Sequence, residues 1–158
     1  MKNIFLALLI LILMPINASA TTWATATSKH ESNGRVIIFR YIKEFDKDFK
    51  RSDQPTRIIL VWRYEGEKGM PNKAEHARMN ELEDALEPMV ESGGFSTLAL
   101  VSTGEGLREW IYYTKSEEAF FEKLNLALRE LKPFPIEIHS ADDPEWKNYE
   151  EFAKTVKE

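Results

Sequence analysis

The sequence contains no cysteine. This absence excludes disulfide bonds, thiolate metal ligands and a lipid-modified cysteine. Hydrophobic burial therefore has to stabilise the fold without covalent cross-links. A chain of 158 residues is long enough to bury a sizeable core in one domain.

Positively charged residues are fewer than negatively charged ones. The chain has 21 lysines and arginines against 26 aspartates and glutamates, which gives a formal net charge of −5 at pH 7. Proteins that bind nucleic acid or anionic membranes gain most of their affinity from lysines and arginines that neutralise phosphates. The composition thus argues against both as partners.

Only one long apolar run occurs, at residues 4–14, preceded by Lys2 and followed by the small residues Ala18-Ser19-Ala20. This order is typical of a cleavable secretory signal. A membrane anchor is the alternative, but a spanning helix needs about 20 apolar residues, roughly twice the length of this run. We expect cleavage after Ala20 and a periplasmic or secreted product, residues 21–158, that is not inserted in a membrane.

Six segments have the composition of β-strands. The segment at residues 58–62 is apolar at every position, which is typical of a central strand covered on both faces. Short turns containing glycine predict two hairpins, one N-terminal and one in the middle of the chain. The six segments are residues 23–28, 36–42, 58–62, 95–103, 107–114 and 136–139. Residues 43–54 are interpreted as a solvated loop or a single short turn.

Three segments show the apolar spacing of amphipathic helices, within residues 72–92, 116–131 and 144–156. Pro88 predicts that the first helix kinks or ends early, because proline removes a backbone hydrogen bond and clashes with the preceding turn. Asp143 is a favourable N-cap, and Pro144 is favourable as the first helical residue that follows it. We therefore expect the terminal helix to begin directly after Asp143.

The order of these elements after the first hairpin is strand, helix, strand, strand, helix, strand, helix. It predicts a single α/β domain of the α+β type: a ferredoxin-like, split βαβ sandwich with helices on one face of an antiparallel sheet. The N-terminal hairpin and the C-terminal helix are additions to this unit, at an edge or on the open face.

Three stretches together resemble a known family: Trp23, residues 106–113 with Trp110, and residues 142–149 with the element Asp-Asp-Pro-x-Trp. They are similar to a bacterial family of uncharacterised proteins, the domain of unknown function 695 (DUF695). The resemblance extends over roughly residues 23–152 and implies a domain type but no reaction.

Motifs for catalysis, metals and nucleotides are absent from the linear sequence. No Gly-x-Ser-x-Gly element occurs, and Gly104-Glu105-Gly106 lacks the third glycine of a dinucleotide-binding loop. The acids at 142, 143 and 145 are explained by the start of a helix. The three histidines, His30, His76 and His139, lack the spacing of a helical metal site. We predict no catalytic residue, metal site or cofactor.

An aromatic strand is the one candidate for a binding surface. Alternation places Arg108, Trp110 and Tyr112 on one face of their strand, and we group Trp62 with them. If that face is open, these four side chains form a stacking platform, as aromatic strands do in some RNA-binding domains. The negative net charge of the chain and its predicted secretory signal argue against nucleic acid as the ligand. The alternative is that Trp110 and Tyr112 pack beneath the terminal helix, against its aromatic residues.

Two functional hypotheses follow. The first is a non-enzymatic binding or protein-interaction module of the cell envelope, with an unknown protein or small molecule as its partner. The second is an exported, hydrolase-like enzyme whose carboxylates come together from different loops.

Overall fold

The computed structural model describes residues 20–156, so the predicted signal segment lies outside the described residues, apart from Ala20. A six-stranded antiparallel sheet with the order β1-β2-β4-β5-β3-β6 forms the centre of the fold. The strands are β1 (Thr22–Lys29), β2 (Val36–Glu44), β3 (Thr56–Arg63), β4 (Ser96–Gly104), β5 (Leu107–Thr114) and β6 (Ile136–Asp142). The helices are α1 (Lys73–Val90), α2 (Glu117–Leu128) and α3 (Lys147–Thr155). The α+β class and the order of elements predicted from the sequence are confirmed.

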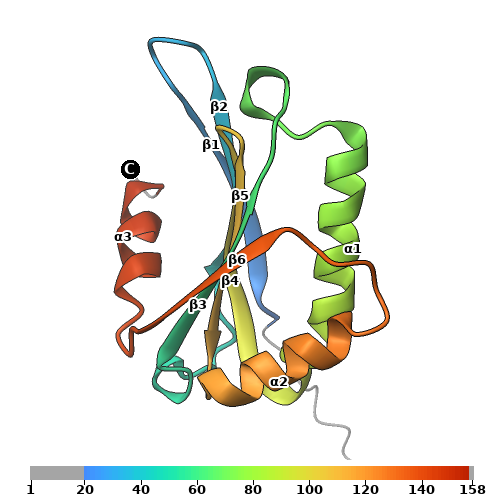
Figure 1. The fold of residues 1–158 in the computed structure, drawn as a ribbon. Coiled ribbons are helices and arrows are strands. Elements are labelled where there is room, and N and C mark those ends of the chain that lie inside the picture. Colours follow the sequence, from blue (N-terminus) through green and yellow to red (C-terminus); the bar gives the residue numbers. More distant parts are fainter. Residues whose placement is uncertain (1–19, 157–158) are drawn as a thin grey trace, which may run out of the picture.

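Helices cover both faces of the sheet. In Figure 1, α1 and α2 lie on one side of the strands and α3 on the other. Helix α3 thus lies on the face opposite α1 and α2, one of the two positions expected for the C-terminal helix from the sequence. This explains why β3 is apolar at consecutive positions: Ile58 and Leu60 belong to the core beneath α1 and α2, while Ile59 packs towards α3.

The larger core lies between the sheet and the helix pair. Residues three or four positions apart on one side of α1 are buried there, among them Met79, Leu82 and Leu86. Phe120 and Leu124 of α2 are buried with them. Side-chain caps begin both helices, since Asn72 accepts a hydrogen bond from Glu75 N and Ser116 accepts one from Ala119 N.

Pro88 does not end α1 early. The helix continues through it to Val90, whose side chain is fully buried. The proline lies in the last turn, where only one intrahelical hydrogen bond is lost. Of the two expected outcomes, a kink or an early end, the early end is therefore wrong.

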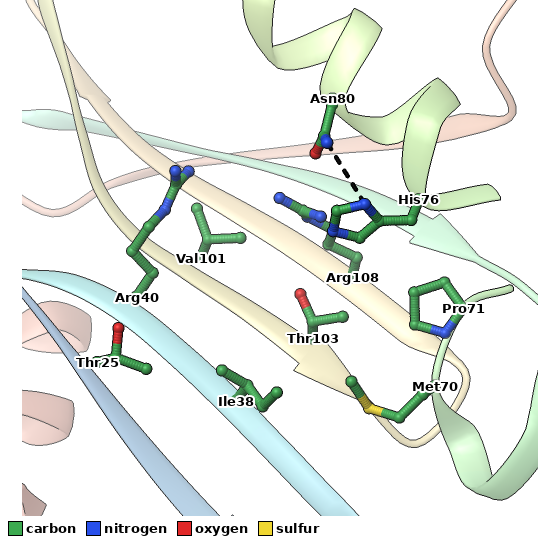
Figure 2. Close-up of a pocket in the computed structure, with 10 residues that line it drawn as sticks. All are labelled: Thr25, Ile38, Arg40, Met70, Pro71, His76, Asn80, Val101, Thr103 and Arg108. Atoms are coloured by element: carbon green, nitrogen blue, oxygen red, sulfur yellow. Dashed lines mark hydrogen bonds between the residues drawn. The ribbon is translucent and has the colours of Figure 1, made fainter. Parts of the chain in front are cut away.

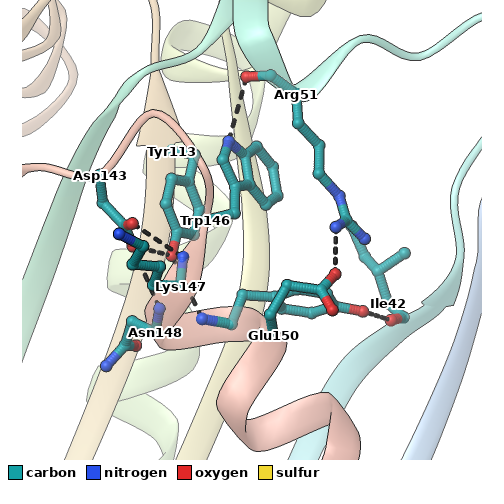
Figure 3. Close-up of polar contacts among 9 residues, drawn as sticks. Ile42, Arg51, Tyr113, Asp143, Trp146, Lys147, Asn148 and Glu150 are labelled. Carbon is teal, nitrogen blue, oxygen red and sulfur yellow. Dashed lines mark hydrogen bonds and ion pairs between the residues drawn. The ribbon is translucent and has the colours of Figure 1, made fainter.

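The start of α3 also differs from the prediction. Asp143 does accept hydrogen bonds from helical N–H groups, those of Lys147 and Asn148, but the helix begins only at Lys147 (Figure 3). Trp146, with φ of 55° in the left-handed region, is the residue before the helix. The intervening turn places the indole of Trp146 beneath the helix, which a helix starting at Pro144 would not do.

Residues 43–54 contribute more than a solvated loop. Part of this segment continues β2 to Glu44, and a short 3-10 helix, η1 (Arg51–Asp53), follows. Phe45 and Phe49 stack on each other and contact the ring of Trp146 edge-on. The segment thus completes the smaller core under α3.

The N-terminal hairpin extends the sheet on the side of β4. Residues 37–41 of β2 pair with residues 100–104 of β4. Gly104 is required at the end of this pairing, because a Cβ there would lie 2.4 Å from the carbonyl oxygen of Val36. The hairpin reaches past the helix pair in Figure 1, and it supplies one wall of the site described next.

Candidate functional site

The four residues proposed from the sequence do not form an exposed platform. Their exposed fractions are 3% for Trp62, 6% for Arg108, 1% for Trp110 and 0% for Tyr112. They lie on the sheet face covered by α1 and α2, not beneath α3. The alternative prediction, that Trp110 and Tyr112 pack beneath the terminal helix, is also wrong. The residues of β5 that pack beneath α3 are their neighbours Ile111 and Tyr113.

Two of these residues converge on one carboxylate of α1. Glu83 accepts hydrogen bonds from Trp110 Nε1 at 2.8 Å and from Arg108 at 3.1 Å, and it pairs with Arg40 of β2. Burial alone would raise the pKa of Glu83, but these hydrogen bonds and the two positive charges outweigh it and lower the pKa. Glu83 therefore stays ionised and fixes both guanidinium groups.

A groove of about 440 Å³ lies beside this ion cluster, between α1 and the N-terminal hairpin (Figure 2). We call it the arginine groove. Strands β1, β2, β4 and β5, helix α1 and the loop before α1 all contribute to it. It is lined by Thr25, Ile38, Arg40, Met70, Pro71, His76, Asn80, Val101, Thr103 and Arg108.

The lining of the arginine groove has a definite chemistry. Two guanidinium groups, an imidazole and an amide stand among apolar side chains, and none of the lining residues is acidic. His76 and Asn80 are exposed on successive turns of α1 and lie within 3.4 Å of each other. One carboxylate, Glu83, pairs with both arginines beside the groove.

Arg108 has unused hydrogen-bonding capacity in this groove. Its side chain is 8% exposed, and Nε is buried without a hydrogen-bond partner among the described residues. Buried donors normally have a partner, since an unsatisfied buried donor costs about 1–3 kcal/mol.

A second groove of about 390 Å³ shares Arg40 with the first and runs towards the end of α1. We call it the glutamate groove, and it is lined by Trp23, Arg40, Glu83, Glu87, Glu91 and Leu98. Burial, together with the charges of Glu87 and Glu83, raises the pKa of Glu91 to about 7, although a hydrogen bond from Leu98 N opposes the rise. Two carboxyl groups with opposite pKa shifts therefore lie in one groove.

Sequence reasoning missed most of the residues that line the two grooves. Arg40, Asn80 and Glu83 were not singled out, and His76 was considered only as a possible metal ligand. A signal existed: the polar residues 76, 80, 83, 87 and 91 recur every three or four positions, so they share one face of α1. Without the position of the hairpin, that face could not be told from an ordinary solvated one.

Comparison with known protein families identifies the family of this chain. The model of a family described as "Family of unknown function (DUF695)" matches residues 21–153. The chain belongs to this family. The DUF695 resemblance inferred from the tryptophans and the Asp-Asp-Pro-x-Trp element is thereby confirmed, and the match includes every residue that lines the two grooves. No curated protein matches the chain.

The described part of the DUF695 domain lacks clustered metal ligands and a membrane-spanning helix. Within residues 20–156, no group of three or more His, Cys, Asp or Glu side chains is placed to hold a metal ion. In the same part of the chain, no helix has the length and apolar character needed to cross a bilayer.

Proposed function

We propose that this DUF695 protein is an exported, non-enzymatic binding protein of the cell envelope, and that the arginine groove holds a small organic anion. The observation that carries the proposal is the lining of the groove: two arginines, a histidine and an asparagine around an apolar floor, with no acid among the lining residues. The predicted signal at residues 1–20 supports the cellular location.

The ligand class follows from the donors. Guanidinium groups bind carboxylate and phosphate oxygens with paired, charge-assisted hydrogen bonds. The imidazole of His76 and the amide of Asn80 add donors from the helix side of the groove. Ile38, Val101 and Met70 offer apolar contacts, which favours an anion that carries a hydrocarbon portion. The volume of about 440 Å³ lies in the usual range for small-molecule sites.

Calorimetric titration tests the proposal with three sodium carboxylates of increasing apolar size: acetate, hexanoate and 3-phenylpropionate. Affinity should rise along the series, and hexylamine, a cation with a similar chain, should not bind. Arg40→Gln should weaken the binding of 3-phenylpropionate at least tenfold. Arg63→Gln, which removes an arginine that is 67% exposed and pairs with Glu137, is the matched control and should bind normally. Equal binding of the carboxylate and the amine, or an unchanged affinity in Arg40→Gln, would overturn the proposal.

We infer in addition that residues 56–142 form a ferredoxin-like unit. The support is the chain order β3-α1-β4-β5-α2-β6 combined with the spatial order β4-β5-β3-β6, which is the split βαβ arrangement. In this interpretation, the β1–β2 hairpin and α3 are additions, and the arginine groove lies where the first addition meets the unit.

An exported hydrolase is the second candidate, favoured by the glutamate groove. Pairs of carboxyl groups whose surroundings push their pKa values apart can divide the roles of acid and base, and Glu91 and Glu83 are shifted in opposite directions. A panel of p-nitrophenyl esters and glycosides tests this candidate. Turnover that is present in the wild type and lost in Glu91→Gln would favour the enzyme; absence of turnover across the panel would favour the binding protein.

A further inference from the structure

The outermost strand of the hairpin has an unusual edge. β1 is the first strand in the sheet order and pairs, among the described strands, with β2 alone. Its pairing with β2 is regular from Trp23 to Lys29, with one irregularity between Thr22 and Trp23. Alternate residues of this eight-residue strand therefore point their backbone N–H and C=O groups away from β2.

The sequence of β1 lacks the features that normally protect such an edge. Residues 22–28 carry neither a charge nor a proline, whereas edge strands usually carry charged side chains or proline that prevent pairing with another chain. The opposite edge of the sheet, β6, shows the usual protection, with Glu137, His139 and Asp142 along its length. The two edges thus differ in their suitability for strand pairing.

Exposed apolar side chains gather next to the unprotected edge. Trp23 is 41% exposed and Ile38 is 38% exposed, and they are two of the three large hydrophobic residues exposed in the described part of the chain. Thr27 pairs with Ile38 in the hairpin, so Trp23, Thr27 and Ile38 project from the same face. A strand added along β1 would place its own side chains beside Trp23 and Thr27 on this face.

We propose that β1 is a dimer interface, on which β1 of a second copy adds antiparallel to form one continuous twelve-stranded sheet. A two-fold interface must be complementary to itself, and the uncharged residues 24–28 at the centre of β1 meet this condition in antiparallel pairing. In the register centred on Ala26, Thr25 lies opposite Thr27 of the second copy, and Trp23 lies opposite its Lys29.

Dimerisation would also change the arginine groove. Thr25 of β1 lines the groove, and β1 is the last strand on that side. The added strand continues the floor of the groove beyond Thr25, so the second copy contributes to the same surface.

Sedimentation equilibrium of the processed protein, from micromolar to millimolar concentration, tests the interface. We expect a monomer–dimer equilibrium in the wild type. The double variant Thr25→Lys/Thr27→Lys should be monomeric, because it places like charges opposite each other across the two-fold axis. The matched control His139→Lys/Ala141→Lys adds two lysines at exposed positions of the other edge and should dimerise normally.

Thermal melting checks that the variants are folded. Should the double variant melt early, Thr25→Glu/Thr27→Glu replaces it, since both side chains are exposed and like charges again lie opposite each other. A wild type that remains monomeric at every concentration would overturn the proposal, as would a folded β1 variant with the wild-type mass distribution.

Discussion

The indole of Trp146 stacks face to face on the phenol ring of Tyr113, with ring centroids 3.8 Å apart and an interplanar angle of 8°. Both side chains are fully buried. Trp146 Nε1 also donates hydrogen bonds to the carbonyl oxygens of Arg51 and Gln54, at 3.1 and 3.0 Å. One residue thus joins the start of α3, the central strand β5 and the segment that follows β2 (Figure 3).

Trp146→Ala should destabilise the protein by about 3–5 kcal/mol, because it removes a large buried ring and leaves a cavity. The free energy of unfolding measured in urea gives the value. Leu126→Ala is the control: this side chain is 50% exposed, and surface substitutions usually change stability by at most about 0.5 kcal/mol. Similar small losses in both variants would show that α3 contributes little to the fold.

Ionisation of Asp143 should make the free energy of unfolding depend on pH in the acid range. Burial alone would raise its pKa, but hydrogen bonds from Tyr113 Oη and from the N–H groups of Lys147 and Asn148, with the charge of Arg57, outweigh burial and lower the pKa. A lowered pKa means that the folded state favours the ionised form. The stabilisation is therefore complete above the ordinary carboxyl pKa of about 3.9 and is lost as pH falls through the lower, folded-state value.

Asp143→Asn should accordingly lose roughly 1–3 kcal/mol at neutral pH and show a shallower loss of stability in acid. Urea unfolding between neutral and acid pH measures both effects. Asp142→Asn changes the adjacent, exposed residue and should follow the wild-type curve. Parallel curves for Asp143→Asn and the wild type would contradict this assignment.

Ionisation of Glu91 should have the opposite effect on stability, which should fall as pH rises. Its pKa is raised from 4.5 to about 7, chiefly by burial, so the folded state favours the neutral form. Stability is then unaffected at low pH and declines as pH rises from about 4.5 to about 7. At about 1.4 kcal/mol per pKa unit, the decline amounts to at most about 3.5 kcal/mol. Glu91→Gln should abolish it, whereas Glu151→Gln, an exposed residue of α3, should leave it in place.

Trp110→Ala distinguishes a core role from a surface role for the aromatic strand. Trp110 is 1% exposed, and its Nε1 donates to Glu83. We expect a loss of about 3–5 kcal/mol, the usual cost of removing a buried tryptophan side chain, measured by urea unfolding. A near wild-type stability would contradict the placement of Trp110 beneath α1.

Much of the fold could be predicted from the sequence because its determinants are local. Apolar runs and helical spacing identified all six strands and all three helices of the described region. The start of α3 was predicted wrongly because the deciding interaction, the stack of Trp146 on Tyr113, joins distant parts of the chain. The assignment of helices to faces failed for a similar reason: the alternation of Trp110 and Tyr113 separates two faces but does not say which helix covers each.

The grooves were harder to predict than the fold. Arg40 and Arg108 are far apart in the sequence, and both contact Glu83 only because β2 and β5 are placed on either side of β4. Arg108 was assigned to the correct face of its strand, but it was proposed as part of an exposed platform and is buried. Sites assembled from several strands and one helix leave no contiguous motif in a single sequence.

The most direct test of the binding proposal is a two-dimensional 1H–15N NMR titration of the processed protein with sodium 3-phenylpropionate. The proposal predicts saturable shifts concentrated on backbone amides that border the arginine groove, those of residues 38–40, 76–80, 101–103 and 108, with the α3 amides unchanged. Shifts confined to α3, or no saturable shift at any concentration of the carboxylate, would contradict it.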